Sequence, residues 1–173
     1  MTIEQIETLA QLRPCFELRH EVYCKLMHAF PINPFEVECD LWDLRSFHFR
    51  AQQGGNLVGY ARFVQSCKGH FPMEDHGFTL PPDFPRDKAL EFSRFCVPPK
   101  SRVPRVSVQM VKAADQWSRD HGYTHWVFSS NSSVTALAER EGWRFDSLGE
   151  PKRHHNDLYH PFAIPLFEGR FGW

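Results

Sequence analysis

The segment ALEFSRFCV (residues 89–97) decides the fold class of this chain. Its hydrophobic alternation predicts a strand that ends at Pro98 and Pro99. A helical pattern follows, with one apolar face made by Val106, Met110, Ala113, Ala114 and Trp117. A second strand is predicted over 123–129, so strand, helix and strand alternate, which favours a sheet with helices on both faces.

Toward the N-terminus, period-two runs at 47–51 and 57–64 flank the turn Gly54-Gly55-Asn56 and predict a hairpin. The first 30 residues are predicted to be helical, with Thr2 and Gln5 at capping-box spacing. Pro14 suits the first turn of a second helix. The acid-rich stretch 36–43 and the Pro-rich stretch 66–88 are predicted to be loops.

Toward the C-terminus, a helix over 132–141 is predicted, capped by Asn131 or Ser132 and closed by Gly142. A strand is expected over 143–148, and a final strand over 162–167 within the tail. We therefore predict one α/β (or mixed α+β) domain over residues 1–173, with a central sheet of antiparallel and parallel strands flanked by helices.

Composition excludes several classes of protein. The 20 Lys and Arg residues nearly balance the 21 Asp and Glu residues, so a general nucleic-acid binder is not expected. No apolar run has the length of a membrane span, and the first 13 residues lack the basic and apolar regions of a signal peptide. Five cysteines without a CxxC pair fit reduced thiols, and we expect a cytoplasmic location.

The strand 89–97 also carries the most informative polar residues. Alternation places Glu91, Ser93, Phe95 and Val97 on one face and Arg94, with Phe92 and Cys96, on the other. Charges are costly among apolar neighbours unless they are paired. Two interpretations stay open: a structural ion-pair network that includes Arg62, Asp40 and Asp43, or a functional one in which Glu91 is a general base.

Other candidates have less support. His154, His155 and His160 are a weak metal site, because adjacent histidines on a strand point to opposite faces, and we expect no metal. Cys96 is a weak candidate nucleophile. Lys100, Arg102 and Arg105 precede a helix and form either a phosphate site or a solvated loop. The motifs GxSxG, Walker A and GxGxxG are absent.

Four blocks in order resemble the acyl-homoserine lactone synthase (autoinducer synthase) family. They lie between residues 15 and 145 and read LRHEVY (18–23), ECDLWD (38–43) followed by His48, GYAR (59–62) and EFSRFCV (91–97). The blocks are similar also to the long-chain N-acyl amino acid synthases and the exosortase-associated acyltransferases. The resemblance implies a GNAT-like fold, in agreement with the element order.

The resemblance also implies a reaction. A fatty acyl group would pass from a thioester, on acyl carrier protein or coenzyme A, to the amine of an amino-acid-like acceptor. Glu91 would be the base, with Ser93, Arg62 and Arg94 as further catalytic-site residues. The substrate-binding set would be Arg19, Asp40, Asp43, Phe95 and Val97, and Arg62 and Arg94 would pair with Asp40 and Asp43.

The donor would meet Lys100, Arg102 and Arg105 at its phosphates, and the many Phe residues would line an acyl-chain pocket. No cofactor is expected to stay bound. The segment after Phe63 resembles the N-acyl amino acid and exosortase-associated branches more than the lactone synthases, which favours an N-acyl amino acid over a lactone as the product. The loop at 98–102 is not glycine-rich, which favours acyl carrier protein as the partner.

Two further hypotheses are kept. In the first, the chain is an acetyl-coenzyme A-dependent N-acetyltransferase of small molecules. In the second, it is a non-catalytic acyl-binding domain with the same fold. The ordered presence of all four charged blocks favours the fatty acyltransferase over the binding domain.

Overall fold

The computed structural model describes residues 1–98, 101, 105–154, 157–167 and 171. The chain forms two compact units. The first combines residues 1–63 with 93–114, and the second combines 64–92 with 115–173. The prediction of a single domain over residues 1–173 stays a prediction.

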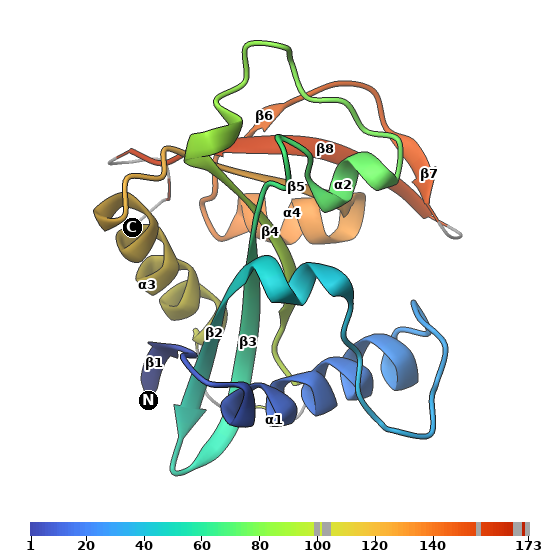
Figure 1. Cartoon of the computed structure of the whole chain (residues 1–173), viewed down its shortest axis with the longest axis vertical. Coiled ribbons are helices and arrows are strands. Elements are labelled where there is room, and N and C mark those ends of the chain that lie inside the picture. The colour runs from blue at the N-terminus through green and yellow to red at the C-terminus, as the bar shows by residue number, and fades with distance from the viewer. Residues whose placement is uncertain (99–100, 102–104, 155–156, 168–170, 172–173) are drawn as a thin grey trace. The chain divides into compact units, whose positions relative to one another are not determined.

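The strands form one mixed sheet in the order β1-β2-β3-β4-β5-β8-β6, with β7 paired to β8 (Figure 1). Their bounds are β1 Thr2–Gln5, β2 Ser46–Gln53, β3 Asn56–Gln65, β4 Ala89–Cys96, β5 His125–Asn131, β6 Asp146–Ser147, β7 Lys152–His154 and β8 Asp157–Pro165. β1 and β2 are antiparallel, β4 and β5 are parallel, and β5 and β8 are antiparallel. The predicted fold class, a sheet of both kinds of pairing with flanking helices, is confirmed.

Seven helical segments accompany the sheet in the described residues. The α-helices are α1 Leu9–Arg19, α2 Pro72–Asp75, α3 Val106–Asp120 and α4 Ser132–Arg140. The other helices are the π-helix η1 His20–Leu26 and the 3-10 helices η2 Leu41–Arg45 and η3 Arg86–Lys88. π-Helices are rare and frequently occur at functional sites, and η1 begins at the residue after Arg19.

In the first unit, helices cover both faces of the β2–β3 hairpin. Helix α1 lies along the hairpin (Figure 1), and its Leu12 and Cys15 belong to one hydrophobic cluster with Tyr60 of β3 and Cys96 of β4. On the other face, Gly59 lies against Val106 and Met110 of α3.

The second unit has an apolar layer on each face of β4 and β5. One layer joins Ala89 and Val127 to Phe71 and Met73, which lie in and beside α2. The other is aromatic, and Phe92 packs on Trp126, Phe128 and Trp143 with ring centroids 5.7 to 6.5 Å apart. The excess of Phe therefore fills a core layer here.

The N-terminal prediction is wrong in its details. Residues Thr2–Gln5 form β1, which pairs with β2, because the isolated capping signal is weaker than the hydrogen bonds of a sheet edge. The same Thr-x-x-Gln spacing recurs at Thr8 and Gln11, where it caps α1. Pro14 lies inside α1 instead of starting a second helix.

The other boundaries differ less. The hairpin, the strand 89–97 and the helices α3 and α4 lie where they were predicted, with Asn131 capping α4 through Val134. The stretch 66–88 holds the short helices α2 and η3, the acid-rich stretch ends in η2, and the strand predicted at 143–148 shortens to β6. The final strand starts earlier than predicted, as β8, because its pairing with β5 spans seven residues.

Gly59 is predicted to be essential for the packing of α3. A Cβ at this position would lie 2.6 Å from Met110 Sδ and 2.9 Å from Val106 Cγ1. We expect Gly59→Ala to lower the free energy of unfolding by about 1–3 kcal/mol, measured by urea denaturation. Combined with Met110→Ala, the loss should be smaller than additive, because the closer of the two clashes is relieved. Strict additivity would contradict this packing.

Candidate active site

Three arginines and three carboxylates of the first unit form a closed ring of ion pairs. Each guanidinium bridges two carboxylates, and each carboxylate receives two guanidiniums. In order around the ring the members are Arg19, Glu38, Arg94, Asp40, Arg62 and Asp43. The charges balance, so the ring brings no net charge into the fold.

Arg19 and Asp43 form the buried side of the ring. Arg19 Nε donates to Glu38 Oε2 at 2.6 Å, and its Nη1 donates to Asp43 Oδ1 at 2.7 Å. Arg62 Nη1 donates to the same Asp43 oxygen at 3.0 Å and to Asp40 Oδ1 at 2.7 Å. Arg19, at the end of α1, and Arg62, on β3, are both almost completely shielded from solvent.

Arg94 and Asp40 form the accessible side. The Arg94 side chain is 22% exposed and that of Asp40 is 29% exposed. Arg94 donates from Nε to Glu38 and from Nη2 to Asp40 Oδ2, the latter at 3.2 Å. Its Nη1 has no hydrogen bond within the described residues, and its guanidinium lies 4.6 Å from the centre of the Phe30 ring. One positive and one negative group therefore reach solvent together.

On the buried side of the ring, the pKa values of Asp43, Arg62 and Arg19 are shifted in favour of the charged forms. Burial raises the pKa of Asp43, but Arg19 and Arg62 lower it by more, so it lies below its ordinary value. Burial lowers the pKa of Arg62, but Asp43 and Asp40 raise it by more. Burial also lowers the pKa of Arg19, but Tyr60, Glu38 and Asp43 raise it by more. Both arginines stay protonated.

The backbone of β4 changes direction inside the ring. Arg94 has a φ of 51°, the left-handed region, which for a residue other than glycine costs about 1–3 kcal/mol. Ser93 Oγ accepts from Arg62 Nε at 3.0 Å, so Ser93 and the adjacent Arg94 contact the same ion-pair ring. The predicted alternation, which put Arg94 on the opposite face from Ser93, is therefore wrong beyond Ser93.

This change also affects the two apolar candidates on the strand. Cys96, predicted to share a face with Arg94, packs against Tyr60 in the core of the first unit. Phe95 is half-buried, and its carbonyl accepts a hydrogen bond from Tyr23 Oη at 2.7 Å. Val97 is half-buried. Their predicted contact with substrate stays a prediction.

Glu91 belongs to the second unit. It is 6% exposed, and its Oε2 accepts the backbone N–H of Met73 at 2.7 Å. This N–H lies in the first turn of α2, where backbone donors lack a partner in the helix. Glu91 is also the last residue of β4 that pairs with β5, opposite Val127.

The remaining candidates have separate outcomes. Lys100 and Arg102 lie outside the described residues, and Arg105 is exposed directly before α3.

Burial raises the pKa of Cys96 to about 12, so this thiol is protonated at neutral pH and is not an activated nucleophile. His155 lies outside the described residues, His154 packs on His76, and His160 stacks on Phe162. No set of three metal-ligating side chains gathers in the described part of the chain.

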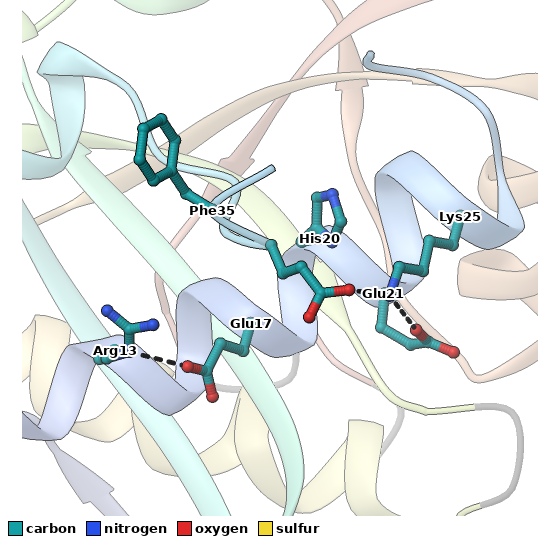
Figure 2. A pocket seen from close by; sticks show the side chains of 7 residues that line it. Arg13, Glu17, His20, Glu21, Lys25 and Phe35 are labelled. Atoms are coloured by element: carbon teal, nitrogen blue, oxygen red, sulfur yellow. Dashed lines mark hydrogen bonds and ion pairs between the residues drawn. The ribbon is translucent and has the colours of Figure 1, made fainter. Parts of the chain in front are cut away.

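A surface cavity of about 270 Å³ lies beside α1 and η1 (Figure 2). Its lining residues are Arg13, Glu17, His20, Glu21, Lys25, Phe35 and Glu36. Figure 2 shows the charged side chains paired with one another, for example Arg13 with Glu17 and Lys25 with Glu21. None of the predicted site residues lines this cavity.

A family model described as an acetyltransferase (GNAT) domain matches residues 18–112 of the chain. The chain belongs to this family. It is an acyltransferase of the GNAT superfamily, and the matched segment contains all six members of the ion-pair ring.

Solved structures of acyl-homoserine lactone synthases share this GNAT fold. BjaI, a coenzyme A-dependent synthase solved with SAM and isopentyl-CoA, is 19% identical, with a TM-score of 0.80 over 97% of this chain and 84% of its own. MesI, also coenzyme A-dependent, is 19% identical, with a TM-score of 0.78 over 98% and 91%. LasI is 18% identical, with a TM-score of 0.76 over 96% and 89%. No curated protein sequence matches the chain. The resemblance noted from the four sequence blocks is thus confirmed at the level of the fold.

Three residues that belong to the ring or contact it are absent from the candidates predicted from the sequence. Glu38 completes the ring between Arg19 and Arg94, and Arg94 pairs with Glu38 where Asp43 had been expected. His48 and Tyr60 contact the ring from β2 and β3. The four sequence blocks already contained these residues, because Glu38 and Tyr60 lie in them and His48 follows the second block.

The described part of this GNAT chain has no helix long and apolar enough to cross a membrane.

Loss of one ring charge should destabilise the fold. We expect Asp43→Asn to lower the free energy of unfolding by about 3–5 kcal/mol, because Arg19 and Arg62 keep buried charges without full compensation. In the native chain the lowered pKa of Asp43 adds stability above its unfolded value near 4, which is lost as the pH falls below that value. Urea denaturation between pH 3 and pH 7 measures both effects.

The matched control is Glu17→Gln, which removes an exposed carboxylate paired with Arg13. It should cost less than about 1 kcal/mol. Equal losses in Asp43→Asn and Glu17→Gln would contradict the importance of the ring.

The thiols should differ in reactivity. Cys39 is exposed, whereas Cys15 and Cys96 are buried with pKa values of about 12. We expect iodoacetamide at pH 8 to label Cys39 in the native chain and to label Cys15 and Cys96 only after unfolding, as mapped by peptide mass spectrometry. Rapid native labelling of Cys96 would revive the nucleophile hypothesis.

Proposed function

We propose that the chain is an N-acyltransferase that moves a fatty acyl group from a thioester to the amine of an amino acid or an amino-acid derivative. The observation that carries the proposal is the accessible side of the ion-pair ring. There Arg94 and Asp40 present opposite charges to solvent, and the Arg94 Nη1 has no hydrogen bond among the described residues. An α-amino acid carries a carboxylate and an ammonium that match these two groups.

The acceptor amine has to lose a proton before it can react. An ammonium has no lone pair, so a base must first accept its proton. Glu91 lies two residues before Ser93 on β4 and supplies a carboxylate for this step, directly or through one water. The neutral amine then attacks the thioester carbonyl carbon, the C–S bond breaks, and the nitrogen loses its second proton to the leaving thiolate as the amide forms. The first proton passes from Glu91 to solvent.

Backbone groups support the attack. β4 pairs in parallel with β5 over Ala89, Leu90 and Glu91 only, although β4 continues to Cys96. N–H groups that follow the last paired residue are candidates for hydrogen bonds to the thioester oxygen as it gains negative charge. The proposed oxyanion site therefore lies on the strand that carries Glu91 and Ser93.

The donor is either acyl-coenzyme A or acyl carrier protein. BjaI and MesI, which share the fold, are described as coenzyme A-dependent. The loop at 98–102 is not glycine-rich, which favours acyl carrier protein as the donor. Arg105 is exposed, and it would contact the phosphate of either donor. We place the enzyme in the cytoplasm, since all five cysteines are free thiols.

The deciding experiment compares the native chain with Glu91→Gln in a bacterial host. We expect N-acylated amines in lipid extracts with the native chain, identified by mass spectrometry, and their loss with the variant at matched soluble levels. The purified variant should lose about 10²–10⁴-fold in kcat/KM, because the general base is gone. Glutamine still accepts the N–H of Met73, so the fold should persist.

Assays with long-chain acyl donors and with acetyl-coenzyme A then distinguish the fatty acyltransferase from the two other hypotheses. Glu17→Gln is the control variant that should stay active. Release of thiol from long-chain acyl donors only when an amine is present supports the proposal. Transfer from acetyl-coenzyme A alone would identify a small-molecule N-acetyltransferase. Binding of acyl chains without turnover, in the native chain and Glu91→Gln alike, would identify a non-catalytic domain.

A further inference from the structure

His48 of β2 is buried, and its two ring nitrogens have different partners. Nε2 lies 3.0 Å from the backbone carbonyl oxygen of Asp43, and Nδ1 lies 2.6 Å from the hydroxyl of Tyr60. A carbonyl oxygen only accepts hydrogen bonds, so Nε2 carries the proton. In the neutral imidazole Nδ1 is then an acceptor, and the Tyr60 hydroxyl donates to it.

This arrangement leaves the Tyr60 oxygen free to accept. Arg19 Nη1 lies 3.4 Å from that oxygen, and the Arg19 guanidinium lies 5.6 Å from the centre of the Tyr60 ring. Arg19 also holds Glu38 and Asp43, which form the buried side of the ion-pair ring. A continuous line of hydrogen bonds thus runs from His48 through Tyr60 to Arg19.

We propose that His48 and Tyr60 are positioning residues that hold the Arg19 corner of the ring, and that protonation of His48 releases it. The proposal rests on the proposed function, because the ring is the site assigned to the acceptor. The carboxylates that Arg19 fixes on its side, Glu38 and Asp43, are the neighbours of Arg94 and Arg62 around the ring. A loosened Arg19 therefore disturbs the accessible side.

Protonation reverses the hydrogen bonds at Tyr60. A charged imidazole donates from both nitrogens, so the Tyr60 hydroxyl stops donating to His48 and accepts from it instead, and its proton turns away from His48. Arg19 is itself only a donor, so it now shares the Tyr60 oxygen with a second cationic donor, and a hydroxyl proton turned toward Arg19 would break their hydrogen bond. The new positive charge also lies near Arg19 and Arg62, and among the described residues Asp43 is the group that compensates it.

Charged and polar groups on three elements packed on His48 contribute to this balance. Asp43 faces it from η2, Arg62 and Tyr60 from β3, and Arg19 and the Phe16 ring from α1. Burial lowers the pKa of His48, as do Arg19 and Arg62, while Asp43 raises it by less. The imidazole is thus neutral at pH 7. In the unfolded chain the pKa of this histidine is near 6.5, so below that pH the unfolded chain binds a proton that the folded chain does not. The folded state therefore loses stability as the pH is lowered.

The first test needs no substrate. The full chain, labelled with ¹⁵N in histidine and arginine, is titrated from pH 7.5 to pH 5 and followed by NMR. His48→Gln assigns the His48 signals. We expect His48 to be the Nε2–H tautomer at pH 7.5, and the Arg19 Nε–H signal to shift with the same midpoint as His48. In Tyr60→Phe, His48 should still titrate while the Arg19 shift is at least halved.

A second variant guards against misfolding of Tyr60→Phe. His48→Asn places an amide oxygen near the position of Nδ1, where it accepts from Tyr60 but does not titrate. The Arg19 signal should then be independent of pH. His28→Asn is the control, because His28 is exposed and its left-handed φ of 53° suits asparagine. An Arg19 signal that ignores His48, or that still follows pH in His48→Asn, would overturn the proposal.

The acceptor role has its own readout. With the acceptor found in lipid extracts, KM of the native chain should rise at least tenfold as His48 becomes protonated, while kcat changes by less than threefold. In His48→Asn the KM profile should be flat, and a native-like profile there would overturn the acceptor role. If no acyl transfer is found, the proposed function fails, whereas the NMR titration still decides whether His48 and Tyr60 hold Arg19.

Discussion

The buried guanidinium of Arg19 is the constraint on which the rest of the site depends. A charge with no exposed surface is tolerated only with close partners, and Glu38 and Asp43 supply them at 2.6 and 2.7 Å. These two carboxylates must then be neutralised on their other sides, which Arg94 and Arg62 do. Asp40 closes the circuit between them. The end of α1, the approach to η2, and strands β3 and β4 are thereby fixed to one another by charge.

The ring confirms one of the two interpretations that the sequence left open, while Glu91 as a general base stays a prediction. The charges do form a structural ion-pair network, and the same network leaves Arg94 and Asp40 partly exposed to solvent. A preorganised set of charges binds a polar substrate without first having to be ordered, which is what catalysis requires of a binding site. In the proposed function, stability and acceptor binding depend on one set of side chains, so variants must be judged on both.

Periodic patterns predicted most of the fold. The β2–β3 hairpin, β4, α3 and α4 have strong periodicity and clear turn or capping residues, and they lie where the sequence indicated. β1 was missed because a four-residue edge strand has too few residues to show a period, and its partner β2 is more than 40 residues away. The Arg94 side chain was placed on the wrong face because alternation assumes a regular strand, and a left-handed φ leaves no trace in the order of apolar and polar residues.

A closed and neutral ring has a consequence for how the family can change over time. Replacement of one member alone leaves an unbalanced charge in a buried place, so single replacements should be removed by selection. An arginine and an adjacent carboxylate can be exchanged together at much lower cost. Homologous chains should therefore differ at these six positions two at a time, and the positions that change together should be neighbours around the ring rather than neighbours in the sequence.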